Sequence, residues 1–464
     1  MLTSHIRLGV TGLARSGKTV FITALIHNLL QGGRLPFLDV AAQGRLKSAY
    51  LVPQPDDDIP RFSYEKHVGS ITGSDRIWPE STNRISQLRL ALEFETTDFI
   101  WRQFGTSKVL VDIIDYPGEW LLDLPLMEMS YAEWCSEALE LASMPERQTL
   151  SKDWLDFIKA TDPSASPDEG LGEKASDLFK SYLKACRSKD HALSTVPPGR
   201  FLMPGDLEGS PALTFSPLIL PDGRTEGDTL GAMMEKRFEA YKSRVVSPFF
   251  YNHFSRLDRQ IILVDALHVI NAGAEAIEDM RRALQQILRC FNTGRNSWLN
   301  YIWNKKIDRI VFAATKADQL HHTSHDRLER IMKMLTEDAV DRAEFKGADV
   351  KAVAMSSIRS TREAEISQNG EALPCILGIP LKGANMNGQV FDGNKEIAIF
   401  PGDLPAEPTE LIDQNSKSEY GSGFLQFLDF RPPVLTETKS TGGVTMPHIR
   451  FDRALEFLIG DKLR

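Results

Sequence analysis

A glycine-framed loop near the start of the chain has the residue types needed to hold a chain of phosphates. The stretch GLARSGKT fills every fixed position of the pattern G-x-x-x-x-G-K-[S/T], from Gly12 to Thr19. Glycines let backbone N–H groups turn toward a phosphate, a lysine places a cation between β- and γ-oxygens, and a threonine hydroxyl binds Mg²⁺. The predicted phosphate-binding residues are Leu13, Ala14, Arg15, Ser16, Gly17, Lys18 and Thr19.

A carboxylate at the end of an apolar stretch could help to hold the magnesium ion. In VLVDIIDYPGEW, Asp115 closes the apolar run and Gly118 follows three residues later. A carboxylate at the carboxyl end of a strand can bind Mg²⁺ through water, and the glycine can donate its N–H to a γ-phosphate. We therefore predict Thr19 and Asp115 as metal-site residues and Gly118 as a nucleotide contact.

Two later stretches indicate which base is bound. In RIVFAATKADQL, the residues Thr315, Lys316 and Asp318 follow an apolar run and resemble the [N/T]-K-x-D guanine-specificity motif of the GTPase superfamily. A carboxylate only accepts hydrogen bonds, so it suits the N1–H and the exocyclic amine of guanine together, whereas adenine lacks both donors at these positions. The predicted contacts of a weaker third loop are Ser356, Ser357 and Ile358.

A threonine between the phosphate loop and the next apolar strand is the candidate switch residue. In DRIWPESTNRISQL, Thr82 lies just ahead of a predicted strand, where GTPases hold a threonine that reaches Mg²⁺ and the γ-phosphate. We choose Thr82 as a nucleotide and metal ligand. Ser81 and Thr72 are alternatives, and so is an ordinary loop threonine.

These residues require strands that end in loops, and the hydrophobic pattern supplies them. Apolar runs alternate with helical patterns, which predicts an α/β fold with a mainly parallel sheet flanked by helices, as in a P-loop GTPase core. The expected strands are 6–10, 85–95, 107–115, 259–265, 309–315 and 350–355, and the second and third could pair as a hairpin. Residues 35–75 lose this regularity, and the stretch VPQPDDDIPRF is expected to be an exposed loop.

Two insertions are expected within this core. We assign 1–120 to the first part of the core, with the phosphate loop and switch regions, and 255–360 to its second part, with the base loops. Residues 121–254 form a mostly helical insertion, 361–435 a small β-rich insertion, and 436–464 end in a helix that packs on the core.

The overall composition excludes several classes of protein. The chain has 464 residues with a formal net charge of −9, so a broad basic face for nucleic acid is not expected. Its four cysteines are scattered, which argues against a disulfide framework. No run reaches the roughly 18 to 20 apolar residues of a membrane span, and the N-terminal stretch has no targeting pattern. We expect a cytoplasmic protein.

Taken together, these motifs make the chain resemble the YcjX-like family of bacterial P-loop GTPases. The resemblance rests on GLARSGKT, the Trp-Pro before Thr82, DYPGEW, TKAD and the long insertion after the D-x-x-G motif. It implies GTP and GDP as bound nucleotides, an association with stress response, and a protein partner that could be a membrane protein. The chain would then lie at the inner membrane only through that partner.

Three residues are predicted to take part in catalysis: Arg15, Lys18 and Glu119. The loop resembles that of guanylate-binding and atlastin GTPases, in which the arginine at this position acts as an internal arginine finger; an outward-pointing loop side chain is the alternative. Glu119 stands where small GTPases often carry the glutamine that orients the attacking water. A surface acid of the switch loop is an equally good interpretation.

The leading hypothesis is a Mg²⁺-dependent, GTP-hydrolysing regulatory protein whose switch loops act on a protein partner. The main alternative is a nucleotide-gated scaffold with negligible hydrolysis. A P-loop kinase is disfavoured because it does not need T-K-x-D, and a dynamin-like GTPase because no lipid-binding segment is evident. A nucleotide-dependent homodimer is the assembly that would assist catalysis.

Two weaker signals are interpreted as structural. The stretch QLHHTSH gathers His321, His322 and His325, but no carboxylate or cysteine at ligand spacing completes a metal site, and Ser324 is typical of a helix N-cap. Asp265, which closes the run IILVD, is expected to cap a helix or turn.

Overall fold

The computed structural model describes residues 3–13, 15–80, 84–97, 105–188, 190–223, 225, 227–290, 307–345, 347–368, 371–386, 388–413, 423–426, 428–435 and 444–464. The chain divides into two compact units. The first comprises Met1–Tyr116, Leu257–Ala274 and Lys305–Arg464, and the second comprises Pro117–Arg256 and Glu275–Asn304. The domain boundaries that we assigned from the sequence stay predictions.

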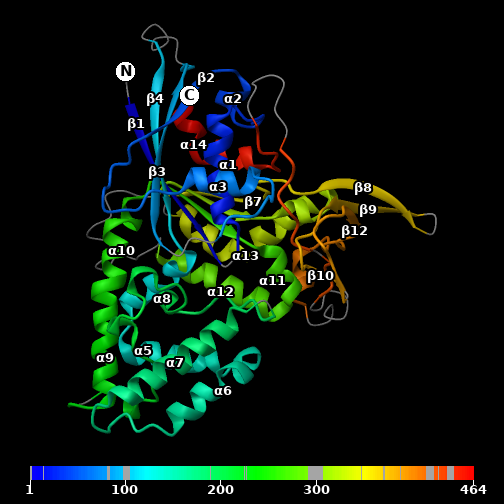
Figure 1. Cartoon of the computed structure of the whole chain (residues 1–464). Helices are drawn as coiled ribbons and strands as arrows, with labels where there is room; N and C mark the ends of the chain where they lie inside the picture. Colours follow the sequence, from blue (N-terminus) through cyan, green and yellow to red (C-terminus); the bar gives the residue numbers. More distant parts are fainter. Residues whose placement is uncertain are drawn as a thin grey trace. The chain divides into compact units, whose positions relative to one another are not determined.

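The first unit is built around a seven-stranded sheet with the order β2-β3-β4-β1-β5-β6-β7 (Figure 1). The five adjacent strands β4, β1, β5, β6 and β7 are parallel to one another. β3 is antiparallel to both of its neighbours, β2 and β4. The strands are β1 Thr3–Gly12, β2 Leu46–Val52, β3 Ser86–Phe94, β4 Ser107–Asp115, β5 Arg259–Val264, β6 Arg309–Ala314 and β7 Asp349–Ala354. The carboxyl ends of five parallel strands therefore meet at one edge.

The central strands are buried because they are covered on both faces. Every residue of β5 is buried, which fits its continuous apolar sequence. The six strands predicted from apolar runs are all present, and the predicted hairpin is the antiparallel pair β3 and β4. The predicted α/β fold class is confirmed.

Helices from both ends of the chain share one hydrophobic core against the sheet. Phe21 of α1 and Phe451 of α14 pack edge to face with ring centroids 5.3 Å apart. In Figure 1 the blue α1 and the red α14 lie side by side. The helices of this unit are α1 Lys18–Leu30, α2 Asp39–Ala42, α3 Tyr64–Thr72, α11 Ala266–Ala272, α13 His325–Phe345 and α14 Phe451–Ile459. The C-terminal helix is thus present as predicted.

In residues 35–75 the expected loop VPQPDDDIPRF, except for its first residue, lies between β2 and α3, but the irregular pattern did not indicate the elements around it. This region contains α2, β2 and α3. β2 has mostly half-buried residues and pairs only with β3, at the sheet edge. Its sequence, LKSAYLV, lacks a clear alternation, so its strand form depends on the hydrogen bonds offered by β3.

A small β-rich region follows the last core strand, as predicted. One antiparallel sheet has the order β12-β9-β8, and β10 pairs with β11. The strands are β8 Arg362–Gln368, β9 Glu371–Gly378, β10 Asn385–Met386, β11 Gln389–Val390 and β12 Ile397–Ile399.

The second unit is helical and has an aromatic core. Trp134 stacks on Phe238 with ring centroids 4.9 Å apart, and Trp154 stacks on Tyr182 at 5.7 Å. It starts with the 3-10 segment η1 Gly118–Glu128. Its helices are α5 Tyr131–Ala142, α6 Pro145–Lys159, α7 Glu169–Cys186, α8 Gly199–Leu202, α9 Leu230–Tyr241, α10 Ser247–Asn252 and, except for its first residue, α12 Ala274–Cys290. Among the described helices of the whole chain, none combines the length and apolar character needed to cross a membrane.

Two buried carboxylates of this unit are accommodated in different ways. Asp279 pairs with the guanidinium of Arg147 at 2.5 Å, and both side chains are almost fully buried. Asp123 accepts hydrogen bonds from the Tyr241 hydroxyl at 2.6 Å and from the Gly199 amide at 2.6 Å. Burial raises the pKa of Asp123 from 3.8 to about 6, and the hydrogen bonds only partly offset this effect.

The raised pKa of Asp123 predicts a specific pH dependence of stability. The folded protein binds more protons than the unfolded chain between pH 3.8 and about 6, so this carboxyl group favours folding at low pH. The contribution, about 3 kcal/mol at roughly 1.4 kcal/mol per pKa unit, is lost as the pH rises through this window. We expect Asp123→Asn to remove it, as measured by urea unfolding at a series of pH values.

The matched control is Asp156→Asn. Asp156 is exposed and pairs with Lys152, which lowers its pKa, so its contribution to stability changes below pH 4 and in the opposite direction. Identical pH slopes for wild type and Asp123→Asn between pH 4 and 6 would contradict the assignment.

Candidate functional site

The phosphate loop lies between the end of β1 and the start of α1. Gly17 is the N-cap of α1 and has a φ of 77°, a left-handed conformation that glycine adopts without strain. Gly12 ends β1, and a Cβ there would meet the Ser16 hydroxyl at 1.9 Å. Leu13 donates its N–H to the Leu263 carbonyl of the neighbouring strand at 3.2 Å. The loop thus has the strand, glycine turn and helix N-terminus that anion binding requires.

Arg15 has an unusual backbone conformation for its residue type. Its φ is 60°, and its side chain is exposed. Its neighbour Ser16 is buried and donates its N–H to the Leu13 carbonyl at 3.1 Å. The Arg15 side chain is therefore accessible to solvent, while the backbone of the loop stays tied to the sheet. Ala14 lies outside the described residues.

The predicted phosphate lysine and the predicted metal-site carboxylate form an ion pair. Lys18 Nζ lies 2.6 Å from Asp115 Oδ1, with only 9% and 1% of the two side chains exposed. Ser86 donates its hydroxyl to Asp115 Oδ2 at 3.4 Å. Lys18 follows the loop after β1, and Asp115 ends β4, where it lies opposite Val10 of β1. The parallel pairing of these two strands brings the residues together.

The oxygen donors at this position suit a hard divalent cation. The Thr19 hydroxyl lies 3.4 Å from the Glu80 carbonyl oxygen, and the Asp115 carboxylate follows the neighbouring strand. Hydroxyl, carboxylate and phosphate oxygens are the ligands that Mg²⁺ prefers. The residues present fit this ion. Thr82, predicted as a further ligand, lies outside the described residues.

Gly118 and Glu119 belong to the helical unit and are held within it. Gly118 starts η1. Glu119 is 4% exposed and forms an ion pair with Arg187, just after α7. The backbone of Gly199 packs so closely on the Glu119 carbonyl that a Cβ there would lie 1.9 Å from its oxygen. The interpretation of Glu119 as a surface acid is therefore wrong, because the carboxylate is buried and paired.

The predicted base loop follows β6. Thr315 donates its N–H to Val264 of β5 at 2.9 Å, and Ala317 donates to Met355 after β7 at 3.1 Å. The Asp318 carboxylate is 4% exposed. The loop is therefore tied to the strands on either side of β6, with the predicted guanine-binding carboxylate close to that edge.

One oxygen of Asp318 has partners from the third loop. Asp318 Oδ2 accepts hydrogen bonds from the Ser360 amide at 2.8 Å and the Ser360 hydroxyl at 2.6 Å. Among the described residues, Oδ1 takes part in no hydrogen bond. The Thr361 hydroxyl also bonds to the Asp318 carbonyl. Ser360 thus fixes the carboxylate with one oxygen unused, although sequence reasoning did not select it.

The third loop is itself held by the C-terminal segment. Ser356 exchanges two backbone hydrogen bonds with Ile449, each of 2.9 Å. Its hydroxyl bonds to the Ile358 carbonyl at 2.9 Å. Ser356, Ser357 and Ile358 are all buried. The three predicted residues therefore lie together at the end of β7.

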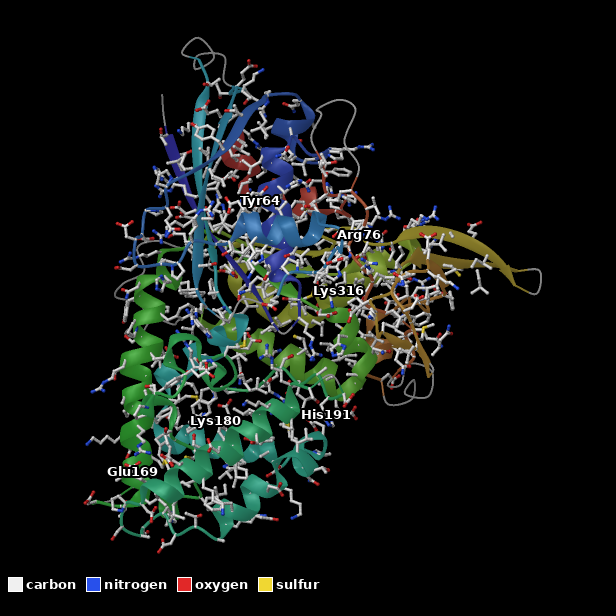
Figure 2. All side chains as sticks on the ribbon, in the orientation of Figure 1. Tyr64, Arg76, Glu169, Lys180, His191 and Lys316 are labelled. Atoms are coloured by element: carbon white, nitrogen blue, oxygen red, sulfur yellow. The ribbon has the colours of Figure 1, made fainter. Side chains whose placement is uncertain are left out.

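Lys316 lies between two carboxylates that were not predicted as part of the site. This lysine is labelled in Figure 2 and has a φ of 60°. Its Nζ lies 2.7 Å from Asp265 Oδ2 and 3.9 Å from Asp429 Oδ1. Burial lowers the pKa of Lys316, but the charges of Asp265 and Asp429 more than offset this and raise it. Asp265 also accepts from the His268 amide at 3.3 Å, which confirms its predicted capping role.

Residues 428–432, which we call the connecting segment, contact both the base loop and the chain ahead of Thr82. Gln319 donates to the Leu428 carbonyl at 3.2 Å, and Trp78 donates its indole N–H to the Phe430 carbonyl at 2.6 Å. Arg76 bonds to the Pro432 carbonyl at 3.0 Å. No sequence motif marks this segment, because its backbone rather than its side chains makes these contacts.

Comparison with known proteins gives one consistent answer. The YcjX-like family matches residues 6–463. The chain is 38% identical over 473 residues to "Ras-like GTPase YcjX" of Escherichia coli strain K12, with 99% of this chain and 96% of that protein covered. It is 33% identical over 487 residues to "Ras-like GTPase YcjX" of Shewanella oneidensis strain MR-1, with 99% and 95% covered. The chain therefore belongs to the YcjX-like family.

Proposed function

We propose that this protein binds GTP with Mg²⁺ and hydrolyses it to GDP. The observation that carries the proposal is the convergence of the phosphate loop, Asp115 and Asp318 at the carboxyl ends of the parallel strands β1, β4 and β6. The names of the two relatives, both Ras-like GTPases, support it.

The chemistry assigned to the chain's own residues follows from their positions. On nucleotide binding, Lys18 exchanges the Asp115 carboxylate for β- and γ-phosphate oxygens, and backbone N–H groups of residues 13–19 surround the phosphates. Thr19, Thr82 and Asp115 would hold Mg²⁺, which when bound would supply positive charge to neutralise the phosphates. The unused Asp318 Oδ1 accepts from the guanine edge, while Ser360 holds Oδ2.

Glu119 favours a second candidate function. Its carboxylate pairs with Arg187 inside the helical unit, so it is not free to orient a water molecule in this conformation. A scaffold that binds GTP with negligible hydrolysis is consistent with this pairing. GDP formation by the purified protein, with GTP or ATP and with or without Mg²⁺, separates the two functions.

The cellular role is proposed on the family resemblance. It comprises regulation of a protein partner, which could be a membrane protein, a stress-associated function and a cytoplasmic location with attachment to the inner membrane through that partner. A GTPase rate that rises with protein concentration would support a nucleotide-dependent homodimer.

Guanine selectivity is predicted to depend on Asp318. In Asp318→Asn, the side-chain oxygen would accept from Ser360 and the NH₂ group would point toward the base. This group cannot accept from guanine N1–H, so we expect GTP affinity to fall roughly 100-fold or more. Affinity for xanthosine triphosphate should rise, because its C2 carbonyl accepts a hydrogen bond. Competition binding with labelled nucleotides measures both.

Asp349→Asn is the matched control, because Asp349 is exposed and starts β7, at the opposite end of that strand from the third loop. It should leave both affinities unchanged. Unaltered GTP selectivity in Asp318→Asn would refute the assignment of this carboxylate.

Arg15 is predicted to act as an internal arginine finger. A guanidinium that swings onto the transferring phosphoryl group stabilises its developing charge, an effect worth about 10³-fold or more in kcat. We expect Arg15→Ala to lower kcat to this extent with little change in GTP affinity, as measured by single-turnover hydrolysis and equilibrium binding. Arg34→Ala, in the loop after α1, serves as the control, and equal turnover of wild type and Arg15→Ala would exclude the role.

A further inference from the structure

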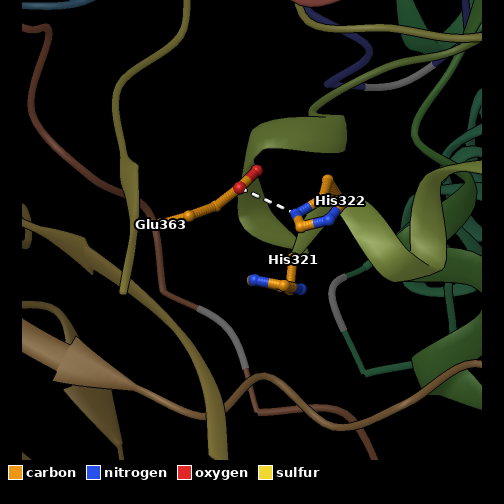
Figure 3. Close-up of side chains that lie close together, drawn as sticks. All are labelled: His321, His322 and Glu363. Carbon is orange, nitrogen blue, oxygen red and sulfur yellow. Dashed lines mark hydrogen bonds and ion pairs between the residues drawn. The ribbon is translucent and has the colours of Figure 1, made fainter. Parts of the chain in front are cut away.

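The structure brings a carboxylate to two of the three histidines that follow the base loop. His321 and His322 lie between Asp318 and α13, and Glu363 is the second residue of β8 (Figure 3). One potential ligand atom from each residue lies within 4.8 Å of the other two. The sequence interpretation rejected a metal site because no carboxylate stood nearby, but Glu363 comes from 41 residues beyond His322.

The hydrogen bonds of these side chains suit metal ligation. His321 is buried, and its Nδ1 lies 3.0 Å from the Thr323 hydroxyl. Histidines that bind metals usually have such a second partner, which fixes the orientation of the ring. His322 Nδ1 lies 2.8 Å from Glu363 Oε2, so this imidazole and the carboxylate already face each other.

We propose that His321, His322 and Glu363 form a site for a divalent transition-metal ion such as Zn²⁺. Two imidazoles and one carboxylate are ligands that Zn²⁺ favours, whereas Mg²⁺ and Ca²⁺ prefer oxygen ligands alone. Three protein ligands leave a fourth position of a tetrahedral ion for water. The site is separate from the Mg²⁺ position proposed at Thr19 and Asp115.

An arginine beside the site competes with the metal ion. Arg359 lies 3.5 Å from Glu363 Oε1 and balances the negative charge of this carboxylate. Metal binding must offset the loss of this partial pairing, and the repulsion between the ion and the guanidinium weakens binding. We therefore expect removal of the Arg359 charge to strengthen metal binding.

The position of the site links metal binding to the base loops. His321 follows the base loop, while Glu363 comes two residues after Thr361, whose hydroxyl bonds to the Asp318 carbonyl. A bound ion would join the loop after β6 to the loop after β7. This second consequence rests on the proposed GTP binding, whereas metal binding itself does not.

Direct metal binding is the test. Full-length wild type in nucleotide-free buffer is titrated with ZnCl₂ by calorimetry, and the thermal midpoint is followed with and without the ion. We expect one site, at least 10-fold weaker binding in His322→Ala and Glu363→Gln, and several-fold tighter binding in Arg359→Met. His191→Ala, at an exposed histidine of the helical unit, should behave as wild type.

The outcomes are distinguishable. Absence of a Zn²⁺ site in wild type, or equal affinities of wild type, His322→Ala and Glu363→Gln, would overturn the proposal, provided that the metal-free thermal midpoints match. Saturating Zn²⁺ should raise GTP affinity in wild type and not in Glu363→Gln. Zn²⁺ binding without this effect would overturn the link to the base loops and leave the metal site standing, and failure of GTP binding would leave the calorimetry unaffected.

Discussion

The parallel register of β1 with its two neighbours is the constraint on which the candidate site depends. Val10 pairs with Asp115 of β4, and Gly12 pairs with Leu263 of β5. This register sets the Lys18 ammonium 2.6 Å from the Asp115 carboxylate. A shift of one residue would turn Asp115 to the opposite face of the sheet, since side chains alternate along a strand. The pairing of these strands therefore sets the position of the Asp115 carboxylate relative to the loop that carries Lys18.

Both lysines of the site are paired with aspartates that lie at the ends of core strands. Lys18 pairs with Asp115, the last residue of β4, and Lys316 pairs with Asp265, which directly follows β5. A buried charge without a partner costs several kcal/mol, so each pair offsets part of the cost of burying its lysine. An incoming phosphate and its cation can replace the partners of Lys18 without leaving an unbalanced charge.

The sequence predicted those parts of the candidate site whose residues are close together along the chain. Each motif comes after an apolar run, and the strand predicted there is present, which is why the fold class and the neighbourhoods of Lys18 and Asp318 were predictable. It missed Ser360 and Arg187, because their partners are far away along the chain. Ser360 bonds to Asp318, 42 positions away, and Arg187 pairs with Glu119, 68 positions away. It missed β2 for a similar reason: an edge strand with a weak pattern is defined by its partner.

The connecting segment shows why contacts made by backbone carbonyls cannot be predicted from the residue types that carry them. The carbonyls of Leu428 and Phe430 accept hydrogen bonds from Gln319 and Trp78, which lie 241 positions apart along the chain. Leu428 and Phe430 are buried in a small hydrophobic cluster with Ile376 and Ile399, so their residue types reflect packing and give no signal for these carbonyl contacts. The segment bonds to both the base loop and the stretch before Thr82, so movement of one relative to the other must strain or break these hydrogen bonds. A short backbone segment that bonds to both the base loop and the stretch before Thr82 is therefore enough to couple the positions of these two parts of the candidate site.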